Sequence, residues 1–420
     1  NKVEYFDDVN DVIKNYETQL TQYLINAGFE YNVCIDTVKF SCRNNNLAKW
    51  QPDVLLPLKN PFIKIKSFLL YPHPQYLKRL IVKYSNFPIS LIDDYYNCTY
   101  NPNVSIDLSS KNLVVNHSIS NKLYDNVKVA MHIHVFYLDV FEKYLQKLSE
   151  ISYKIDLFIT TDTKDKEQQI IKLYEEKKII HELKVIYIFK NIGRDILPWL
   201  KIAHLFNEYN VVGHFHTKKT NWADSWIGDS WIDEILISLI EPVDKLINTF
   251  YECKNLGIII SDIPFCYKNQ LVDTWGGNKE IFNSLWNKMK CQKNLNAYEL
   301  TYPVMSYGTM FWYRPNALKP LFELNLGEKD FPNEPFPIDG TIAHAIERLL
   351  IYIAWNENYD FKIIIHSKLV TNSFFYKKCI PSCSQPVLED KKQILERKIG
   401  KIVLWFPFKA FKMIKNILKR

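Results

Sequence analysis

The chain has 420 residues, of which 47% are hydrophobic and 24% charged, and its formal net charge is +7. This balance excludes a disordered chain, and no apolar run approaches the ~20 residues that cross a bilayer; the length predicts two or three domains. The positive charge favours anionic partners, namely nucleotide phosphates, an acidic membrane surface or nucleic acid.

Residues 1–95 are predicted to form a small α/β segment. Apolar residues recur at helical spacing from Val9 to Leu24, a strand is expected at Tyr31–Ile35, and a basic helix is expected at Gln75–Tyr84. No chemical constellation stands out in this segment, so a packing or accessory role is expected. Because the chain begins with Asn1 rather than Met, a fragment of a longer protein is expected as an alternative to a complete one.

Residues 96–125 are rich in Asn, Ser, Asp and Tyr and lose the regular apolar spacing. This composition is typical of a linker or a surface excursion. We therefore expect the domain boundary there.

Residues 126–372 are predicted to form a Rossmann-like α/β domain, because apolar strands alternate with helical patterns. Such alternation favours parallel pairing through right-handed crossovers, with helices covering both faces of the sheet. The expected strands are Val127–Val135, Ile155–Thr160, Val185–Phe189, Val211–Phe215 and Leu256–Ile260.

Residues 373–420 form the most basic part of the chain, and from Asp390 onward Lys and Arg alternate with Ile, Leu, Phe and Trp. A helix of this kind over 391–420 is expected to lie on an anionic membrane surface. The equally weighted alternative is a helix docked on the protein's own core with a solvated basic face.

A turn follows the strand at Val185–Phe189 and leads into a helix. Its candidate ligand-binding residues are Asn191, Gly193, Arg194 and Asp195. Glycine permits a tight turn, the guanidinium fork suits a phosphate, and the carboxylate caps the helix or accepts hydrogen bonds from a ribose or a base. The alternative is a capped turn that carries a surface arginine.

The strand at Val211–Phe215 ends in polar and basic residues, which are His214, His216, Lys218 and Lys219. The two histidines are two residues apart and therefore point to the same side, with the lysines in the loop beyond. Ligands bind at the carboxyl ends of such strands, so a site that neutralises a diphosphate leaving group is expected. A metal site is disfavoured, because no third ligand is near and the lysines repel a cation; core histidines beside solvent lysines are the other alternative.

Two aromatic and glycine-containing segments are candidate sugar or acceptor sites. A glycine beside an aromatic ring lets a ligand approach the backbone closely while the ring stacks on a sugar face. The alternatives are a turn packed under a tryptophan and aromatic rings that belong to the core. The residues are Trp275, Gly276, Gly277, Asn278, Gly308 and Trp312.

Asp339 stands near the start of a predicted helix, where His344 and Glu347 share one face. An aspartate at the mouth of a helix is placed to take a proton from a hydroxyl nucleophile, and Glu347 is the reserve base. The alternative for Asp339 is a helix N-cap, with Glu347 as a structural charge. The eight cysteines lack paired zinc-type spacing and are expected to be reduced thiols of a cytosolic protein.

Taken together, these motifs resemble the rhamnan synthesis protein F family, bacterial glycosyltransferases of surface-polysaccharide assembly. The resemblance covers about residues 126–370, and residues 1–95 resemble the segment that closes an upstream glycosyltransferase-like module in longer members. The segments that carry it are 129–137, 156–162, 191–195, 216–219, 275–278, 308–312 and 339–348.

The resemblance implies a GT-A-like fold, a nucleotide-sugar donor such as dTDP-rhamnose, and a lipid-linked glycan acceptor. Because the chain has no Asp-x-Asp motif, no metal or other cofactor is expected, and Lys218, Lys219 and Arg194 replace the cation. Inverting transfer is expected, with Asp339 as base, Asp195 on the nucleotide, and the sugar held by residues 275–278, Gly308, Trp312 and His344.

The expected location is cytoplasmic, peripheral on the inner face of the cell membrane, without a nucleic-acid partner. The alternative function is a non-catalytic glycan-binding or scaffold subunit of a polysaccharide assembly complex. Donor hydrolysis discriminates between the two.

Overall fold

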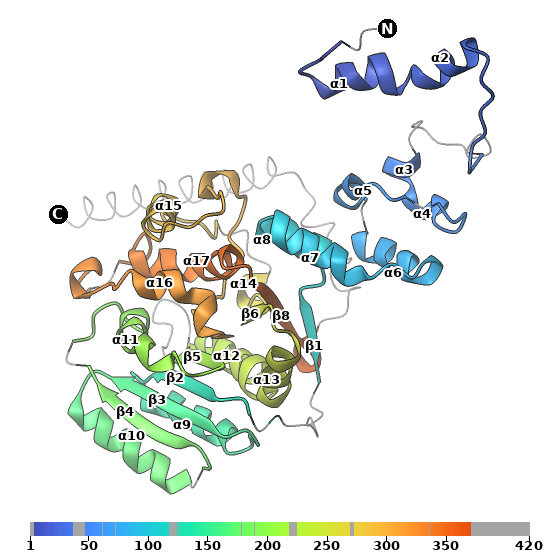
Figure 1. Ribbon diagram of the computed structural model, residues 1–420. Coiled ribbons are helices and arrows are strands. Elements are labelled where there is room, and N and C mark those ends of the chain that lie inside the picture. Colours follow the sequence, from blue (N-terminus) through green and yellow to red (C-terminus); the bar gives the residue numbers. More distant parts are fainter. Residues whose placement is uncertain are drawn as a thin grey trace, which may run out of the picture. The chain divides into compact units, whose positions relative to one another are not determined.

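The computed structural model describes residues 4–36, 47–60, 62–71, 73–116, 124, 126–177, 179–188, 190–217, 225–268, 273–335 and 337–370 (Figure 1). The chain divides into two compact units, residues 1–364 and residues 365–420. The second unit is described over 365–370, where Ser367–Leu369 form a 3₁₀ turn. Among the helices so described, none is both long and apolar enough to cross a membrane.

The regular structure described within residues 4–108 is helical, so the predicted α/β character of residues 1–95 is wrong there. The expected helices near Val9–Leu24 and Gln75–Tyr84 are confirmed, but residues 31–35 form no strand. Tyr31 and Val33 are 64% and 55% exposed, and none of the strands in the described ranges pairs with them. The helices are α1 (Val9–Val12), α2 (Leu20–Asn26), α3 (Leu47–Trp50), α4 (Pro52–Leu55), α5 (Ile65–Leu70), α6 (Pro74–Tyr84), α7 (Ile89–Thr99) and α8 (Pro102–Leu108).

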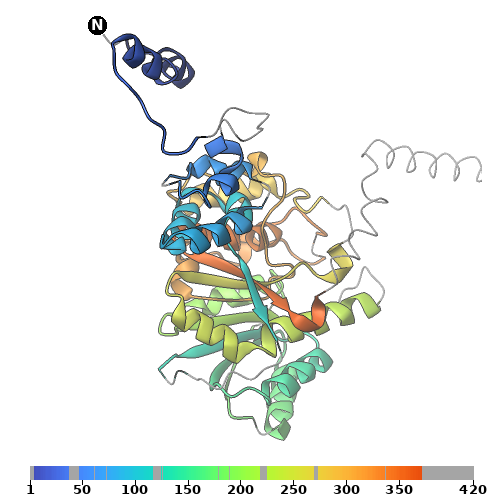
Figure 2. The same cartoon turned by 90° about the vertical axis from the view of Figure 1, so that its right-hand side faces the viewer.

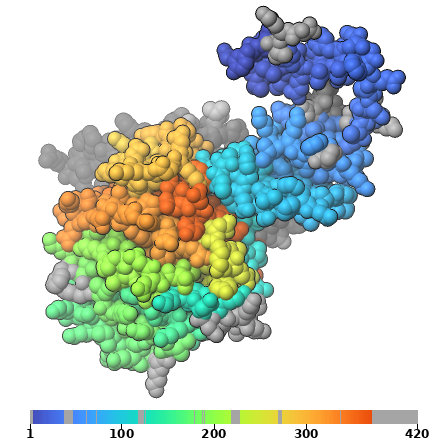
Figure 3. Space-filling view, viewed as in Figure 1, coloured from blue at the N-terminus to red at the C-terminus, as the bar shows by residue number. Residues whose placement is uncertain are grey.

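The linker predicted at 96–125 is also corrected over its described part, which holds the end of α7, all of α8 and strand β1 (Asn112–Val115). One of the polar residues that suggested a linker caps a helix instead. The Asn101 side chain accepts a hydrogen bond from the Val104 amide at the start of α8. The Tyr352 hydroxyl donates to Asn103 Oδ1, and Figure 3 shows the cyan surface of α8 meeting the red-orange surface of residues near 350.

The described residues form an eight-stranded sheet in the order β1-β8-β6-β7-β5-β2-β3-β4. All five predicted strands are found within a few residues of their expected bounds, and β2, β3, β4 and β5 pair in parallel as predicted. Figure 2 shows β1 and β8 side by side at one edge. The other strands are β2 (Val129–His134), β3 (Ile155–Thr161), β4 (Glu182–Tyr187), β5 (Val211–His216), β6 (Leu256–Ser261), β7 (Phe311–Tyr313) and β8 (Asp360–His366).

Strand β7 departs from the predicted all-parallel pattern, because it lies between β5 and β6 and runs antiparallel to both. Phe311, its first residue, is opposite His214 near the end of β5. The segment that precedes β7 therefore reaches the edge of the sheet where the parallel strands end.

Helices cover both faces of the sheet, as predicted. One apolar layer joins Met131, Ile133, Val211 and Phe215 to α9 (Leu138–Leu148), α10 (Lys164–Lys177), α12 (Ser225–Ile235) and α13 (Val243–Glu252). The opposite layer joins the alternate residues Ala130, Val212, Phe311 and Tyr313 to α11 (Ile196–Ile202), α15 (Lys279–Lys288), α16 (Lys319–Glu323) and α17 (Ile342–Asn356). A short helix, α14, spans Phe265–Lys268.

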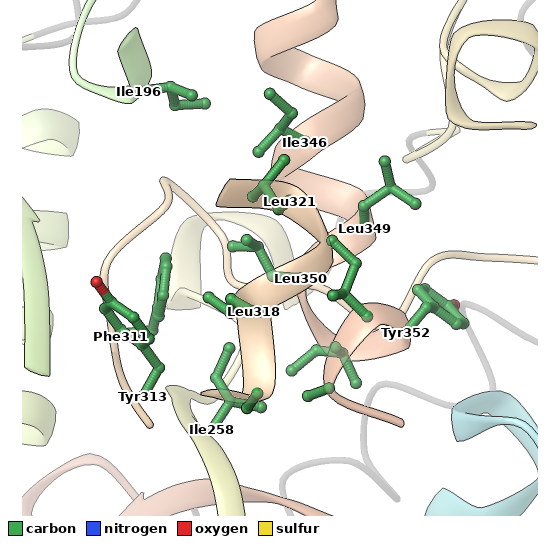
Figure 4. Close-up of a cluster of buried hydrophobic side chains, with 14 of the residues drawn as sticks. Ile196, Ile258, Phe311, Tyr313, Leu318, Leu321, Ile346, Leu349, Leu350 and Tyr352 are labelled. Atoms are coloured by element: carbon green, nitrogen blue, oxygen red, sulfur yellow. The ribbon is translucent and has the colours of Figure 1, made fainter. Parts of the chain in front are cut away.

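Figure 4 shows the second layer, in which Phe311 and Tyr313 of β7 point towards Leu318, Leu321, Leu349 and Leu350. Full burial of one such side chain contributes about 1.5–3 kcal/mol. Strand alternation thus sends the even-numbered residues of β2 and β5 towards α11 and α17, and this is the face that collects the candidate site residues.

Candidate active site

Histidines of neighbouring strands meet on the α11 face of the sheet. His132 pairs in register with His214, and His134 with His216. The Nδ1 atoms of His132 and His214 are 2.9 Å apart, and Thr160 Oγ1 lies 2.9 Å from His132 Nε2 and 3.0 Å from His134 Nδ1. Asp195 Oδ2 lies 3.7 Å from His214 Nε2. We call Asp195, His214, His132, Thr160 and His134 the histidine network.

The turn before α11 brings Asp195 into this network. Gly193 and Arg194 have φ values of 68° and 53°, and a Cβ on Gly193 would collide with Leu197 and Phe331. This tight left-handed turn directs the Asp195 side chain inward, where its residue is 8% exposed and makes no side-chain cap to α11. Trp199, one turn along the helix, stacks on His214 with ring centroids 4.6 Å apart.

The histidines of the network are neutral at pH 7. Burial lowers the pKa of His134 to about 4 and lowers the pKa values of His132 and His214 as well. The expectation that His214 helps to neutralise a diphosphate is therefore corrected, because its ring is fully buried and uncharged. His216 donates from Nε2 to the Gly308 carbonyl at 2.6 Å, while Lys218 and Lys219 lie outside the described residues.

A second group of polar residues comes from three loops and the first turns of α17. Its members are Gly277, Asn278, Gly308, Asp339, Glu347 and Arg348, and we call them the loop cluster. The Gly308 amide donates to Glu347 Oε1 at 2.7 Å, and Arg348 lies 3.4 Å from Glu347 and 3.9 Å from Asp339. The contact between His216 and Gly308 joins this cluster to the end of β5.

Asp339 holds two loops of the cluster together. Its carboxylate accepts hydrogen bonds from Asn278 Nδ2 at 2.6 Å and from the Gly277 amide at 2.8 Å. Partial burial alone raises its pKa, but these hydrogen bonds and the Arg348 charge outweigh that effect and keep the pKa below its ordinary value. The group is thus ionised at pH 7 and its side chain is 37% exposed.

Asp339 is not the N-cap of α17. Thr341 takes that position, with its side chain accepting a hydrogen bond from the His344 amide. The Thr341 hydroxyl also lies 2.8 Å from His344 Nδ1, which ties the predicted acceptor residue His344 into the cap. Asp339 is therefore available for another role at the mouth of the helix.

The two candidate tryptophans lie in the core, which corrects the expectation that they stack on a sugar. Trp275 is 1% exposed and donates to the Leu300 carbonyl, and Trp312 is fully buried and donates to the Leu239 carbonyl. Gly276, beside Trp275, has a φ of 50°, and a Cβ there would fall on Asp339 Oδ2. The glycine pair therefore serves the close approach of Asp339.

Of the remaining candidates, Asn191 and Arg194 are half-buried in the turn before α11. Sequence reasoning missed His132, His134, Thr160 and Arg348 as site residues. The available signal was the His-x-His pattern that occurs in both β2 and β5, since in-register parallel strands bring equal spacings together.

Over the described ranges the structure shows no metal-ligand cluster, and the cavity described below lies away from the candidate residues. There, no three His, Cys, Asp or Glu side chains are placed to hold a metal ion. Cys34, Cys98, Cys253, Cys266 and Cys291 are free thiols. A cavity of about 790 Å³ lies among α5, α6 and α8, where Tyr71, Tyr76 and Arg79 line it, and the candidate residues do not contribute to it.

Comparison with known proteins gives one family. The family described as rhamnan synthesis protein F matches residues 1–359. The protein WxcX, uncharacterized, of two strains of Xanthomonas campestris pv. campestris is 32% identical to this chain over 222 residues. That alignment covers 52% of this chain and 30% of the relatives, so the chain spans about a third of the length of the curated relatives it matches.

Two solved structures show slight likenesses. A cytidylyltransferase from Leptospira borgpetersenii serovar Hardjo-bovis has 10% identity and a TM-score of 0.30, over 58% of this chain and 77% of that one. Residues 1–349 of TarS from S. aureus have 13% identity and a TM-score of 0.29, over 56% of this chain and 57% of that one. Likenesses of this size decide nothing about function.

Proposed function

The chain belongs to the rhamnan synthesis protein F family, and we propose on that ground that it is a polysaccharide glycosyltransferase. In the proposed reaction a sugar moves from a nucleotide-sugar donor, dTDP-rhamnose or a similar compound, to a hydroxyl of a growing bacterial surface polysaccharide. The observation that carries the proposal is the contact of His216, the last residue of β5, with Gly308 of the loop cluster, which brings that cluster to the edge of the sheet beside the histidine network. Ligands of open α/β sheets bind at that edge.

The nucleotide half of the donor is assigned to the turn before α11 and to the end of β5. Arg194, with Lys218 and Lys219, supplies the positive charge that the diphosphate requires, since the network histidines are neutral. Asn191, Gly193 and Asp195 complete this part of a GT-A-like site. The transfer is proposed to need no metal ion.

The sugar and the acceptor are assigned to the loop cluster. The acceptor hydroxyl oxygen bonds to the anomeric carbon as the bond to the diphosphate breaks, and the hydroxyl proton passes to the Asp339 carboxylate. This in-line displacement inverts the anomeric centre. Its support is that Asp339 is ionised and 37% exposed, whereas Glu347, the reserve base, is 17% exposed and bonded to Gly308.

The acceptor is proposed to be a lipid-linked glycan, with the protein peripheral on the cytoplasmic face of the cell membrane. The support is the basic and aromatic composition of residues 391–420. Binding to vesicles with and without anionic lipid tests this, and equal binding to both would contradict it.

The first experiment is calorimetric binding of a panel of nucleoside diphosphates and nucleotide sugars, with and without EDTA, followed by assay of donor hydrolysis. We expect one nucleotide to bind equally well in both conditions. Binding that disappears with EDTA and returns with a divalent ion contradicts the metal-free mechanism. No binding and no hydrolysis would favour a non-catalytic glycan-binding or scaffold subunit.

A pair of charge variants sharpens the assignment. Arg194→Gln should weaken diphosphate binding about 10- to 100-fold, the effect of losing a hydrogen bond to a charged group. Lys201→Gln is the control, because it removes the same charge from α11 where the lysine pairs with Glu328 at the surface. Equal effects of the two variants would remove Arg194 from the site.

A further inference from the structure

From His214 to His134 the histidine network is a single chain of hydrogen bonds with few allowed proton positions, and Asp195 lies beyond hydrogen-bond distance at its His214 end. The Thr160 hydroxyl has one hydrogen, so it donates to at most one of its two neighbours, His132 Nε2 and His134 Nδ1, and when it donates to one it accepts from the other. Likewise, one of the facing Nδ1 atoms of His132 and His214 carries a proton and the other does not. Because each neutral imidazole has one proton, a proton on His214 Nε2 fixes the positions of all the others.

Asp195 selects the direction of the chain. Its Oδ2 atom faces His214 Nε2 at 3.7 Å, and a carboxylate favours a proton on that nitrogen over a lone pair. His214 Nδ1 then accepts from His132 Nδ1, His132 Nε2 accepts from the Thr160 hydroxyl, and Thr160 accepts from His134 Nδ1. In the opposite direction the His214 lone pair would face the carboxylate, which is unfavourable in a buried site.

The last nitrogen of this chain, His134 Nε2, is left without a proton. His134 is the final residue of β2, at the edge of the sheet where the parallel strands end, and it is 5% exposed. Within the described residues its Nε2 atom has no hydrogen-bond partner. Burial holds the pKa of this ring at about 4, so the lone pair persists at neutral pH.

We propose that Asp195 acts through His214, His132 and Thr160 to present the unprotonated Nε2 of His134 as a hydrogen-bond acceptor for a hydroxyl or N–H group of the donor's nucleoside. A buried acceptor rejects groups that cannot donate, because its lone pair is then left unsatisfied. Phosphate oxygens are acceptors and do not match it. The assignment of the ligand rests on the proposed function, whereas the proton positions do not.

The test reads the proton positions directly by NMR of the full chain with ¹⁵N-labelled histidine at pH 7.5. We expect the proton on Nδ1 in His132 and His134 and on Nε2 in His214. A proton on Nε2 of His134 in the wild type would overturn the proposal, whatever the reaction of the protein turns out to be.

Two matched threonine variants separate the network from its surroundings. Thr160→Val keeps the shape but removes the hydroxyl, so His134 should lose its fixed tautomer. Thr161→Val is the control, because Thr161 is equally buried on the same strand but donates to the Val135 carbonyl outside the network. If the His134 tautomer is the same in Thr160→Val as in the control, Asp195 does not set it.

The ligand is tested with the nucleotide that binds best in the panel above. Thr160→Val should weaken its binding about tenfold and Thr161→Val should not, and the wild-type His134 Nε2 signal should shift on binding. Comparison of ribose and 2′-deoxyribose forms distinguishes a ribose hydroxyl from a base N–H as the donor. An unshifted His134 signal, or no nucleotide binding, overturns the ligand assignment. The proton positions measured by NMR do not depend on that outcome.

Discussion

The histidine network and the loop cluster lie on the same side of the sheet but are built in opposite ways. The network sits on strands β2, β3 and β5, is almost fully buried, and has a single carboxylate among neutral groups. The loop cluster is held by turns with positive φ at Gly276, Gly308 and Gly340, and it sets the partly exposed carboxylates of Asp339 and Glu347 beside the buried guanidinium of Arg348. The chemistry of the histidine network therefore depends on which atoms donate its hydrogen bonds, and that of the loop cluster depends on where its charged groups lie.

The largest effect is expected from removing the charge of the proposed base. Asp339→Asn should lower turnover roughly 10²–10⁴-fold while the circular dichroism spectrum is unchanged, because the carboxylate that takes the proton is gone. Glu347→Gln is the control, since this carboxylate occupies the same cluster. A loss confined to Glu347→Gln would transfer the role to Glu347.

Acidification should distinguish the two regions by their pH windows. His134 takes up its proton near pH 4 when the protein is folded and near pH 6.5 when it is unfolded. Its contribution to the free energy of unfolding is therefore fully present above pH 6.5, and about 3 kcal/mol of it is lost as the pH falls to 4. Asp339, whose pKa is also lowered when folded, loses its contribution as the pH falls below its ordinary value of 3.8. Urea unfolding from pH 7.5 to 4 measures the first window.

His134→Gln should reduce the loss of stability between pH 6.5 and 4, and His204→Gln, on an exposed 3₁₀ turn, should leave it unchanged. The same slope in wild type and His134→Gln would show that a different group titrates in this window.

A backbone variant tests how tightly the loop cluster is built. Gly276→Ala places a Cβ on Asp339 Oδ2 in a left-handed conformation, so we expect a loss of about 2–4 kcal/mol in the free energy of unfolding. Gly340→Ala is the control, because its φ is 72° but its nearest neighbour is 3.9 Å away. If both variants lose the same free energy of unfolding, measured by heat or urea, then the left-handed backbone, and not contact with Asp339, is the reason that glycine is needed at position 276.

A smaller effect is expected where the core meets the histidine network. Trp199→Phe loses the Nε1 donation to the Tyr313 hydroxyl at 2.9 Å and should cost about 1–2 kcal/mol of unfolding free energy. Trp286→Phe is matched, because Trp286 is also buried and donates to the Lys293 carbonyl away from the network. Nucleotide affinity should fall only for Trp199→Phe, and unchanged affinity would separate Trp199 from the site.

The sequence predicts the strands better than it predicts the site, for physical reasons. Continuous apolar runs identify β2, β3, β5 and β6, because strands buried on both faces cannot alternate with polar residues. The edge strand β4 begins three residues before its predicted start, at exposed Glu182, because its polar residues alternate with apolar ones. Strand β7 has three residues, Phe311–Tyr313, which carry no information about direction. Trp275 and Trp312 show why aromatic residues mislead, since apolar composition does not distinguish a sugar-binding ring from a core ring.

Charge and polarity mislead in the same manner. His214 suggested a cation, but burial, which depends on helix α11 packing over the sheet, makes it neutral. Asn101 and Pro102 suggested a linker, although they cap and begin α8. For His214 the decisive factor is a helix packed over the sheet, whereas for Asn101 it is the Val104 amide three residues on, to which the side chain bonds as a helix cap.

The position of β7 also governs the order in which the sheet can be completed during synthesis. Strands β4, β3, β2 and β5 are all made before β6, but β6 meets β5 only through β7, which follows it in the chain. Until residues 311–313 leave the ribosome, β5 and β6 each present an unpaired edge, and unpaired edges invite association with other chains. A nascent chain that stops before Phe311 should therefore need a chaperone where the longer chain does not.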